Sequence, residues 1–144
     1  QCDIRIASEN ARFGWVFPLR GITPDTGAGP YLLPHIVGLS RALELMYSGE
    51  IIDAAEAQRI GLVSAVVPAE ALLSSALAMA AKLIVGAPLA IKAIKEVTYG
   101  SLEWSFADFN RARNVRFKAT SDSQDAKEGV ASFLEKRPPE WQGR

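Results

Sequence analysis

The chain has 144 residues, 49% of them apolar and 22% charged, which is the composition of an ordinary globular domain and excludes a disordered chain. Sixteen Lys plus Arg balance sixteen Asp plus Glu, so no net charge draws the protein to nucleic acid or to an anionic membrane. The single cysteine, Cys2, excludes an intrachain disulfide framework and fits a reducing, cytoplasmic compartment.

The first predicted element is a short strand formed by Ile4, Ile6 and Ala7. The chain shows neither an initiator methionine nor a signal sequence, which favours a start in mid-protein. We therefore expect this strand to have no partner within the chain and to pair with residues that precede Gln1. Residues 13–34 then contain too many glycines and prolines for a regular element, so they are predicted to form one long loop.

The middle of the chain alternates helix and strand. Apolar residues at helical spacing predict a helix over 35–48, with Gly49 as its left-handed cap. Asp53 and Glu56 resemble a capping box at the start of a short helix that stops at Gly61. Residues 62–67 read as a strand closed by Pro68.

The rest of the chain is predicted to be helical. One helix starts near residue 72 and ends near Gly86, and Pro88 opens the next. Ser101 is expected to cap a longer helix, and Ser123 the last one, which stops before Pro138. The apolar stretch 71–91 is broken by a lysine, a glycine and a proline, so no helix here is expected to span a membrane.

An ordered series of short motifs resembles the crotonase, or enoyl-CoA hydratase/isomerase, family. The series comprises Cys2 to Ala7, Ala11 to Gly14, Leu32 to Pro34 with Val37-Gly38, Ala42 to Met46 with Ser48-Gly49, Ala54 to Ala57, Gly61 to Val63, and Asp125 to Arg137. The resemblance covers essentially the whole chain. It implies an α/β fold in which the chain is the C-terminal part of a crotonase-like ββα-spiral, mostly helical, with a helical trimerisation region.

This resemblance implies two domains. Residues 1–68 would be the end of the spiral core, with the active-site loop 13–34, and residues 69–144 a helical oligomerisation region. The implied partners are an acyl-CoA substrate and further copies of the protein, as a homotrimer or a dimer of trimers. The missing N-terminal half would carry both amides of the oxyanion hole, often the largest catalytic term, so the chain alone is expected to be inactive.

The loop departs from the hydratase pattern at the residue that should carry the acid/base carboxylate. In hydratases of this family the turn reads F-G-x-P-E, whereas here Phe17 ends the sequence Phe13-Gly14-Trp15-Val16-Phe17. A phenyl ring neither holds nor releases a proton. Water addition by the usual pair of glutamates is therefore not expected.

Asp25 is the candidate catalytic base. It follows Pro24 in Thr23-Pro24-Asp25-Thr26-Gly27, which resembles the isomerase-like branches of the family. Moving a double bond needs one base that takes up a proton and returns it elsewhere, so one carboxylate is enough. The plain alternative is that Asp25 only forms a turn. Four residues are assigned to substrate binding in the same loop: Trp15, Phe17, Gly21 and Thr26.

Two alternative functions stay open. In the first, the aspartate acts as a nucleophile, as it does at the same place in the family's 4-chlorobenzoyl-CoA dehalogenase branch, inside an aromatic acyl pocket that Trp15 and Phe17 would suit. The second is a catalytically inactive fragment that binds acyl-CoA and forms oligomers. For Trp15 and Phe17 themselves, packing of the loop against the core is as suitable a role as lining a pocket.

Phe133 and Lys136 are predicted to share one face of the last helix, because they are three residues apart. In the family the matching pair lies beside the adenine and phosphates of coenzyme A. The plain alternative is core packing for Phe133 and a solvated charge for Lys136. Coenzyme A arrives with the substrate, so no resident cofactor is expected. His35 is the only histidine and is interpreted as structural, and no metal site is predicted.

Overall fold

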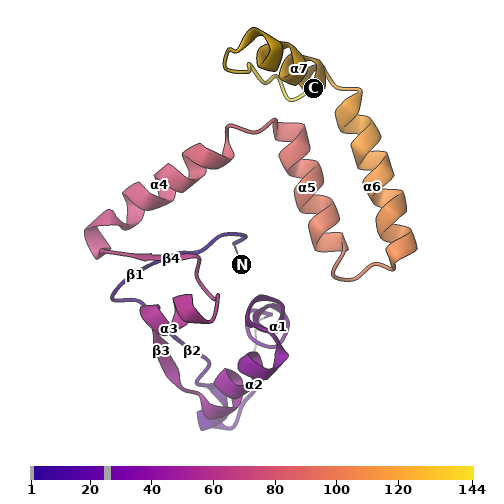
Figure 1. Cartoon of the computed structure of the whole chain (residues 1–144). Helices are drawn as coiled ribbons and strands as arrows, with labels where there is room; N and C mark the ends of the chain where they lie inside the picture. Colours follow the sequence, from indigo (N-terminus) through magenta and orange to yellow (C-terminus); the bar gives the residue numbers. More distant parts are fainter. Residues whose placement is uncertain (1, 25–26) are drawn as a thin grey trace. The chain divides into compact units, whose positions relative to one another are not determined.

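The computed structural model describes residues 2–24 and 27–144, and the chain forms two compact units, Gln1–Met79 and Ala80–Arg144 (Figure 1). The division falls within helix α4 (Leu72–Leu83). The domains predicted from the sequence divide the chain earlier, directly after strand β4 (Ala65–Val67) and its flanking Pro68.

The first strand has its partner inside the chain. Strand β1 (Ile6–Ser8) pairs in parallel with β4, with Ile6 opposite Ala65 and Ser8 opposite Val67. The expectation that this strand lacks a partner within the chain was therefore wrong. It failed because the pairing joins residues almost sixty positions apart, which no local pattern reveals.

A second pair of strands occupies part of the predicted loop. Strand β2 (Arg12–Gly14) runs antiparallel to β3 (Ile51–Asp53), with Phe13 opposite Ile52. A 3₁₀ helix, η1 (Phe17–Arg20), follows β2. The loop expected over 13–34 is thus interrupted by regular structure at both ends, because α1 (Leu32–Val37) has already begun at its far end.

The predicted helix 35–48 is two helices. Gly38 has a φ of 81° and separates α1 from α2 (Leu39–Ser48), a conformation that residues with a side chain adopt rarely. The predicted left-handed cap at Gly49 is confirmed, with a φ of 62°. A Cβ at Gly49 would lie 2.8 Å from Cγ of Leu19, so the missing side chain also lets η1 pack against the end of α2.

The short helix α3 (Ala54–Arg59) begins as predicted. The backbone amide of Glu56 donates to Oδ1 of Asp53 at 2.8 Å, as expected for an N-cap. Leu62 and Val63 are buried but lie in the turn before β4, so the strand predicted over 62–67 is shorter than expected.

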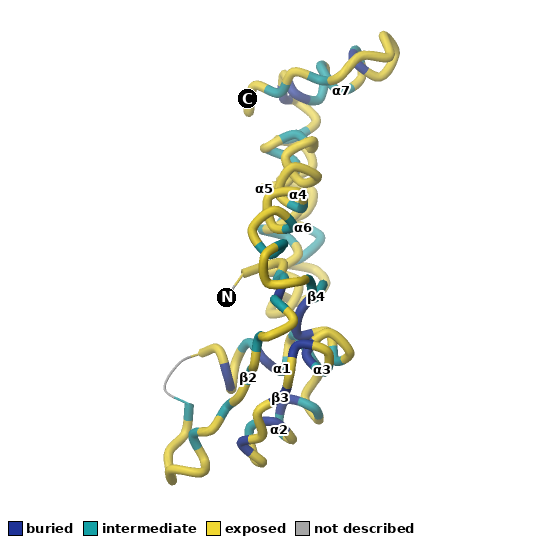
Figure 2. The backbone as a smooth tube through the Cα atoms, turned by 90° about the vertical axis from the view of Figure 1, so that its left-hand side faces the viewer, coloured by how far each residue is buried: buried dark blue, intermediate teal, exposed yellow. Residues whose placement is uncertain are grey.

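The buried core belongs to the first unit. Figure 2 shows the dark blue, buried segments concentrated around β1 to β4 and α1 to α3. Helices and strands contribute to one cluster of buried apolar side chains: Ala7, Leu33, Ala42, Leu45, Ile52, Ala57, Leu62 and Val63. Trp15 and Phe13 pack against this cluster from the region after β1.

The second unit is helical. Pro88 opens α5 (Pro88–Gly100) as predicted, and α5 packs against α6 (Phe106–Ser121). Ser105, not Ser101, caps α6, because its hydroxyl accepts from the backbone amide of Asp108. The predicted cap at Ser123 is confirmed at the start of α7 (Gln124–Glu135), where Oγ accepts from the amide of Ala126 at 3.0 Å.

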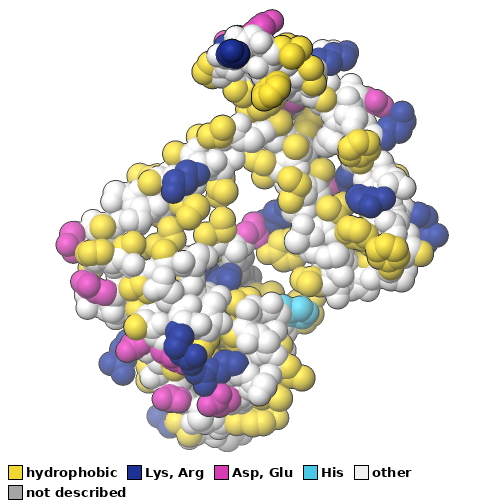
Figure 3. Space-filling model, in the orientation of Figure 1, with side chains coloured by type: hydrophobic (Ala, Val, Ile, Leu, Met, Phe, Trp, Pro, Cys, Tyr) yellow, Lys and Arg dark blue, Asp and Glu magenta, His cyan; other side chains and the backbone are white. Residues whose placement is uncertain are grey.

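Many large apolar side chains are exposed in this structure. Figure 3 shows hydrophobic side chains in yellow on the face in view. The exposed ones of the second unit include Ile84, Ile94, Phe106, Phe117, Phe133 and Leu134. Among the described residues, no single helix is both long and apolar enough to cross a membrane. The pair Ala69–Leu83 and Pro88–Gly100 meets the criteria of length and composition only when the two are taken together across a break.

Candidate functional site

The loop after β2 is closed at its base by contacts around Gly29. Gly29 is buried, and a Cβ there would lie 3.1 Å from Cγ of Pro24 and 3.1 Å from Cδ1 of Trp15. Both rings therefore lie directly against the glycine backbone. Residues 15 and 29, at opposite ends of this segment, are brought together because position 29 has no side chain.

The predicted substrate-binding residues of this loop are placed differently. Trp15 is half-buried and packs against the core cluster, and Phe17 is half-buried at the start of η1. Gly21 is exposed and ends η1 with a φ of 70°, where its amide donates to the carbonyl oxygen of Pro18. Asp25 and Thr26 lie outside the described residues.

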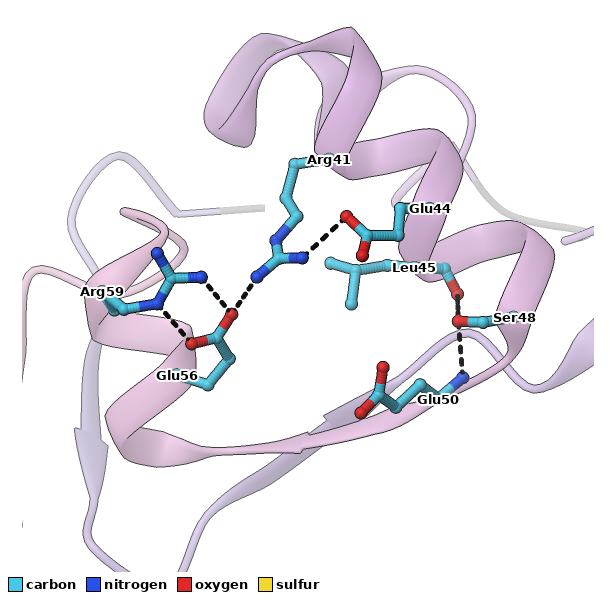
Figure 4. Close-up of polar contacts among 7 residues, drawn as sticks. All are labelled: Arg41, Glu44, Leu45, Ser48, Glu50, Glu56 and Arg59. Atoms are coloured by element: carbon cyan, nitrogen blue, oxygen red, sulfur yellow. Dashed lines mark hydrogen bonds and ion pairs between the residues drawn. The ribbon is translucent and has the colours of Figure 1, made fainter.

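A network of charged side chains joins α2 to α3 (Figure 4). Glu56 accepts two hydrogen bonds from Arg59, each at 2.6 Å, and a further one from Arg41. Arg41 also donates to Glu44 at 2.7 Å. The hydrogen bonds from Arg59 are the main cause that lowers the pKa of Glu56, so this carboxylate stays ionised and is poorly suited to exchange protons near neutral pH.

The end of α7 carries the other predicted ligand contacts. Phe133 is 82% exposed. Lys136 lies one residue beyond the helix with a φ of 54°, so the two residues do not share a helix face as the sequence predicted. The amide of Lys136 donates to Phe133 O and that of Arg137 to Ser132 O, which is the Schellman arrangement that usually has glycine at the left-handed position.

Arg137 fixes the turn that follows. Its guanidinium donates to both oxygens of Glu128, at 2.5 and 2.9 Å, and to Glu135 at 2.6 Å. The backbone amide of Glu140 adds a third hydrogen bond to Glu128. The hydrogen bonds from Arg137 are the largest cause, and that from the amide of Glu140 the next, that lower the pKa of Glu128 to about 2. The sequence does not reveal this role of Glu128, because its partners become neighbours only when the chain folds back.

This pairing predicts a loss of stability in acid. The pKa of Glu128 lies below its ordinary value of 4.5, so its contribution is complete above about pH 4.5 and disappears as the pH falls towards about 2. We expect Glu128→Gln to lower the melting temperature of the full-length protein at about pH 7, and this difference from the unmodified protein to shrink across that window. Glu70→Gln, at an exposed position, is the control, and a difference independent of pH would contradict the assignment.

The comparisons with known proteins identify the class to which this architecture belongs. The family model described as Enoyl-CoA hydratase/isomerase matches residues 1–144. The chain belongs to this family. The crotonase-type α/β fold predicted from the sequence is confirmed, since the enoyl-CoA hydratase from Bacillus anthracis superposes with a TM-score of 0.94 at 34% identity, over 99% of this chain and 55% of that one.

Curated relatives agree with this assignment. The chain is 38% identical to the 2,3-dehydroadipyl-CoA hydratase of Escherichia coli over 99% of its own length and 56% of that protein. It is 39% identical to the crotonyl-CoA hydratase of Syntrophomonas wolfei, over 94% of its own length and 52% of that protein. The chain therefore spans about half the length of these relatives. These shares measure the extent of the match and not its position, so the placement in their C-terminal half is not established by them.

Proposed function

We propose that the protein containing this chain is an acyl-CoA enzyme of fatty acid metabolism that shifts the double bond of an enoyl-CoA, with Asp25 as the single base. The observation that supports this proposal is the loop closed by Trp15 and Pro24 over Gly29. Asp25 follows Pro24 directly in the sequence, and the membership of the family supplies the substrate class.

The proposed reaction needs one proton acceptor that also returns the proton. The carboxylate takes a proton from C2 of a 3-enoyl thioester, the electron pair moves into the enolate, and the same proton is delivered to C4 as the double bond forms between C2 and C3. Phe17 takes no part in proton transfer and serves the acyl chain as an apolar wall. No resident cofactor is required, since coenzyme A belongs to the substrate.

Hydration is the second candidate function. It is favoured by the names of the relatives in Escherichia coli and Syntrophomonas wolfei, both of which are hydratases. A third candidate, acyl-CoA binding without turnover, is favoured by the apolar residue Phe17 at the place of the expected carboxylate. These candidates differ in what happens to the double bond, so one pair of substrates separates them.

The test uses the purified full-length protein with a 3-enoyl-CoA and with a 2-enoyl-CoA. An isomerase increases the absorbance of the conjugated thioester from the 3-enoyl substrate and leaves the 2-enoyl substrate unhydrated. We expect this result. Loss of the conjugated absorbance from the 2-enoyl substrate would replace the proposal by hydration. No change with either substrate, together with measurable binding of coenzyme A, would replace it by a binding function.

The proposal includes assembly into a trimer or a dimer of trimers in the cytoplasm. The exposed apolar side chains of the second unit support assembly, because apolar patches of this kind commonly mark protein interfaces. The proposed contact of Phe133 and Lys136 with coenzyme A is supported by their exposure at the end of α7.

A further inference from the structure

The segment after α7, residues 137–144, folds back along that helix and is called the return segment below. Asp125, near the start of α7, is 2% exposed although it carries a carboxylate. Its Oδ1 accepts from the amide of Gln142 at 2.7 Å and its Oδ2 from the amide of Gly143 at 2.9 Å. Both oxygens of a buried acid are thus used to hold two consecutive residues of the return segment.

The contact is reciprocal. The amides of Gln124 and Asp125, at the start of α7, donate to the carbonyl oxygen of Arg144 at 2.7 and 3.3 Å. Amides in the first turn of a helix have no partner within the helix, so the return segment satisfies groups that would otherwise need water. The segment is therefore fastened to the start of α7 by hydrogen bonds in both directions.

Two further contacts fasten the middle of the return segment. Glu128 binds Arg137 and the amide of Glu140, as described above. The indole of Trp141 lies over Gly129, where a Cβ would be 3.5 Å from the ring, and its Nε1 donates to the carbonyl oxygen of Val85 at 2.7 Å. Asp125, Glu128 and Gly129 thus form one continuous seat on α7.

The turn that leads into this seat contains Lys136 in the left-handed conformation. Among the described residues it is the only residue other than glycine with a positive φ. A side chain disfavours this backbone geometry, so such a residue persists only where its surroundings fix it. Here the helix fixes one side of Lys136 and the anchored return segment fixes the other.

The two cationic residues at this turn, Lys136 and Arg137, differ in their partners. Arg137 is bound to two carboxylates, Glu128 and Glu135, and is not available to an anion. The ammonium of Lys136 takes part in no hydrogen bond or ion pair found within residues 2–24 and 27–144, and it lies in an exposed residue close in sequence to the exposed ring of Phe133. An exposed cation without a partner is suited to the phosphates of coenzyme A, and an exposed aromatic ring is suited to its adenine.

We propose that Asp125 and Glu128 are positioning residues for acyl-CoA binding: by anchoring the return segment they hold Lys136 in its left-handed conformation and so direct its ammonium towards the phosphates of the ligand. This inference rests on the proposed function, which supplies the ligand. Neither acid touches the substrate. Each acts through the backbone of the segment that follows Lys136.

The experiment measures the anchor and the ligand separately in the full-length protein. Asp125→Asn replaces one acceptor by a donor that faces a backbone amide, and we expect hydrogen exchange at Gln142 and Gly143 to become at least about tenfold faster. The Kd for coenzyme A, measured by titration calorimetry, is expected to rise about tenfold, as it should in Lys136→Ala. The KM for the enoyl-CoA should rise with kcat almost unchanged, since uniform binding is lost.

Asp122→Asn is the matched control, because Asp122 carries the same charge next to α7 but is exposed and bonded to Lys118. It should change neither exchange nor affinity. Glu128→Gln removes the second anchor and gives an independent test if Asp125→Asn does not fold.

Unchanged exchange at Gln142 and Gly143 in Asp125→Asn would overturn the proposal. So would faster exchange with unchanged coenzyme A affinity in both anchor variants, while Lys136→Ala weakens binding. If Lys136→Ala also binds coenzyme A normally, the positioning role is refuted, and the enoyl-CoA assay of the unmodified protein still decides the proposed function independently.

Discussion

Asp25→Asn is expected to lower the kcat of the full-length protein for a 3-enoyl-CoA by about a thousandfold. Asparagine has nearly the shape of aspartate, so the loop around Pro24 and Gly29 should keep its contacts. The amide neither accepts the proton from C2 nor returns one to C4, and the chemical step loses its only base. The rate of formation of the conjugated thioester measures this loss directly.

The control for this variant is Glu9→Gln, at an exposed position in the turn between β1 and β2. It removes one carboxylate from the same unit and should leave kcat unaltered. Coenzyme A affinity should be the same in Asp25→Asn and in the unmodified protein, because the proposed base touches only the acyl part. An Asp25→Asn variant with full activity would remove Asp25 from the mechanism, and a covalent adduct on Asp25 would instead favour nucleophilic chemistry.

Local signals in the sequence predicted several helix boundaries correctly. Asp53 and Ser123 cap their helices, and Gly49 ends α2 in the left-handed conformation, because each of these features depends on a few neighbouring residues. The predicted cap at Ser101 was wrong, and the apolar residue that follows Ser101 does not mark the start of α6. The acceptor role belongs to Ser105, whose hydroxyl lies three residues before the amide of Asp108.

The strands and the return segment could not be predicted in the same way. Strands β2 and β3 have three residues each, too few for an alternating pattern, and their pairing of Phe13 with Ile52 joins distant parts of the chain. The anchoring role of Asp125 could not be predicted either, because a carboxylate near the start of a helix normally indicates a solvated charge. Only the folded chain brings the amides of Gln142 and Gly143 to it.

The candidate site combines these two kinds of information. The density of glycine and proline predicted the loop, and the structure adds the contacts of Trp15 and Pro24 with Gly29 that close it. The motif at the end of the chain indicated Phe133 and Lys136 as ligand contacts on one helix face, and the structure corrects this arrangement by placing Lys136 beyond the helix. Conformation, and not helical spacing, therefore determines where this ammonium is presented.

Leu45→Ala is expected to cost about 3 kcal/mol of unfolding free energy in the full-length protein. Leu45 is 1% exposed and belongs to the buried cluster with Leu33, Ala42 and Ile52. Removing its side chain leaves a cavity within this cluster, and the short side chain of Ala42 cannot reach in to fill it. Denaturant unfolding followed by circular dichroism measures the change.

The matched control is Leu39→Ala in the same helix, since Leu39 is 64% exposed. Both variants lose the same side-chain atoms, so the difference between them is dominated by the difference in burial. Leu39→Ala should change the unfolding free energy by no more than about 0.5 kcal/mol. Equal losses in the two variants would mean that the cluster around Leu45 is not the stabilising core against which Trp15 packs.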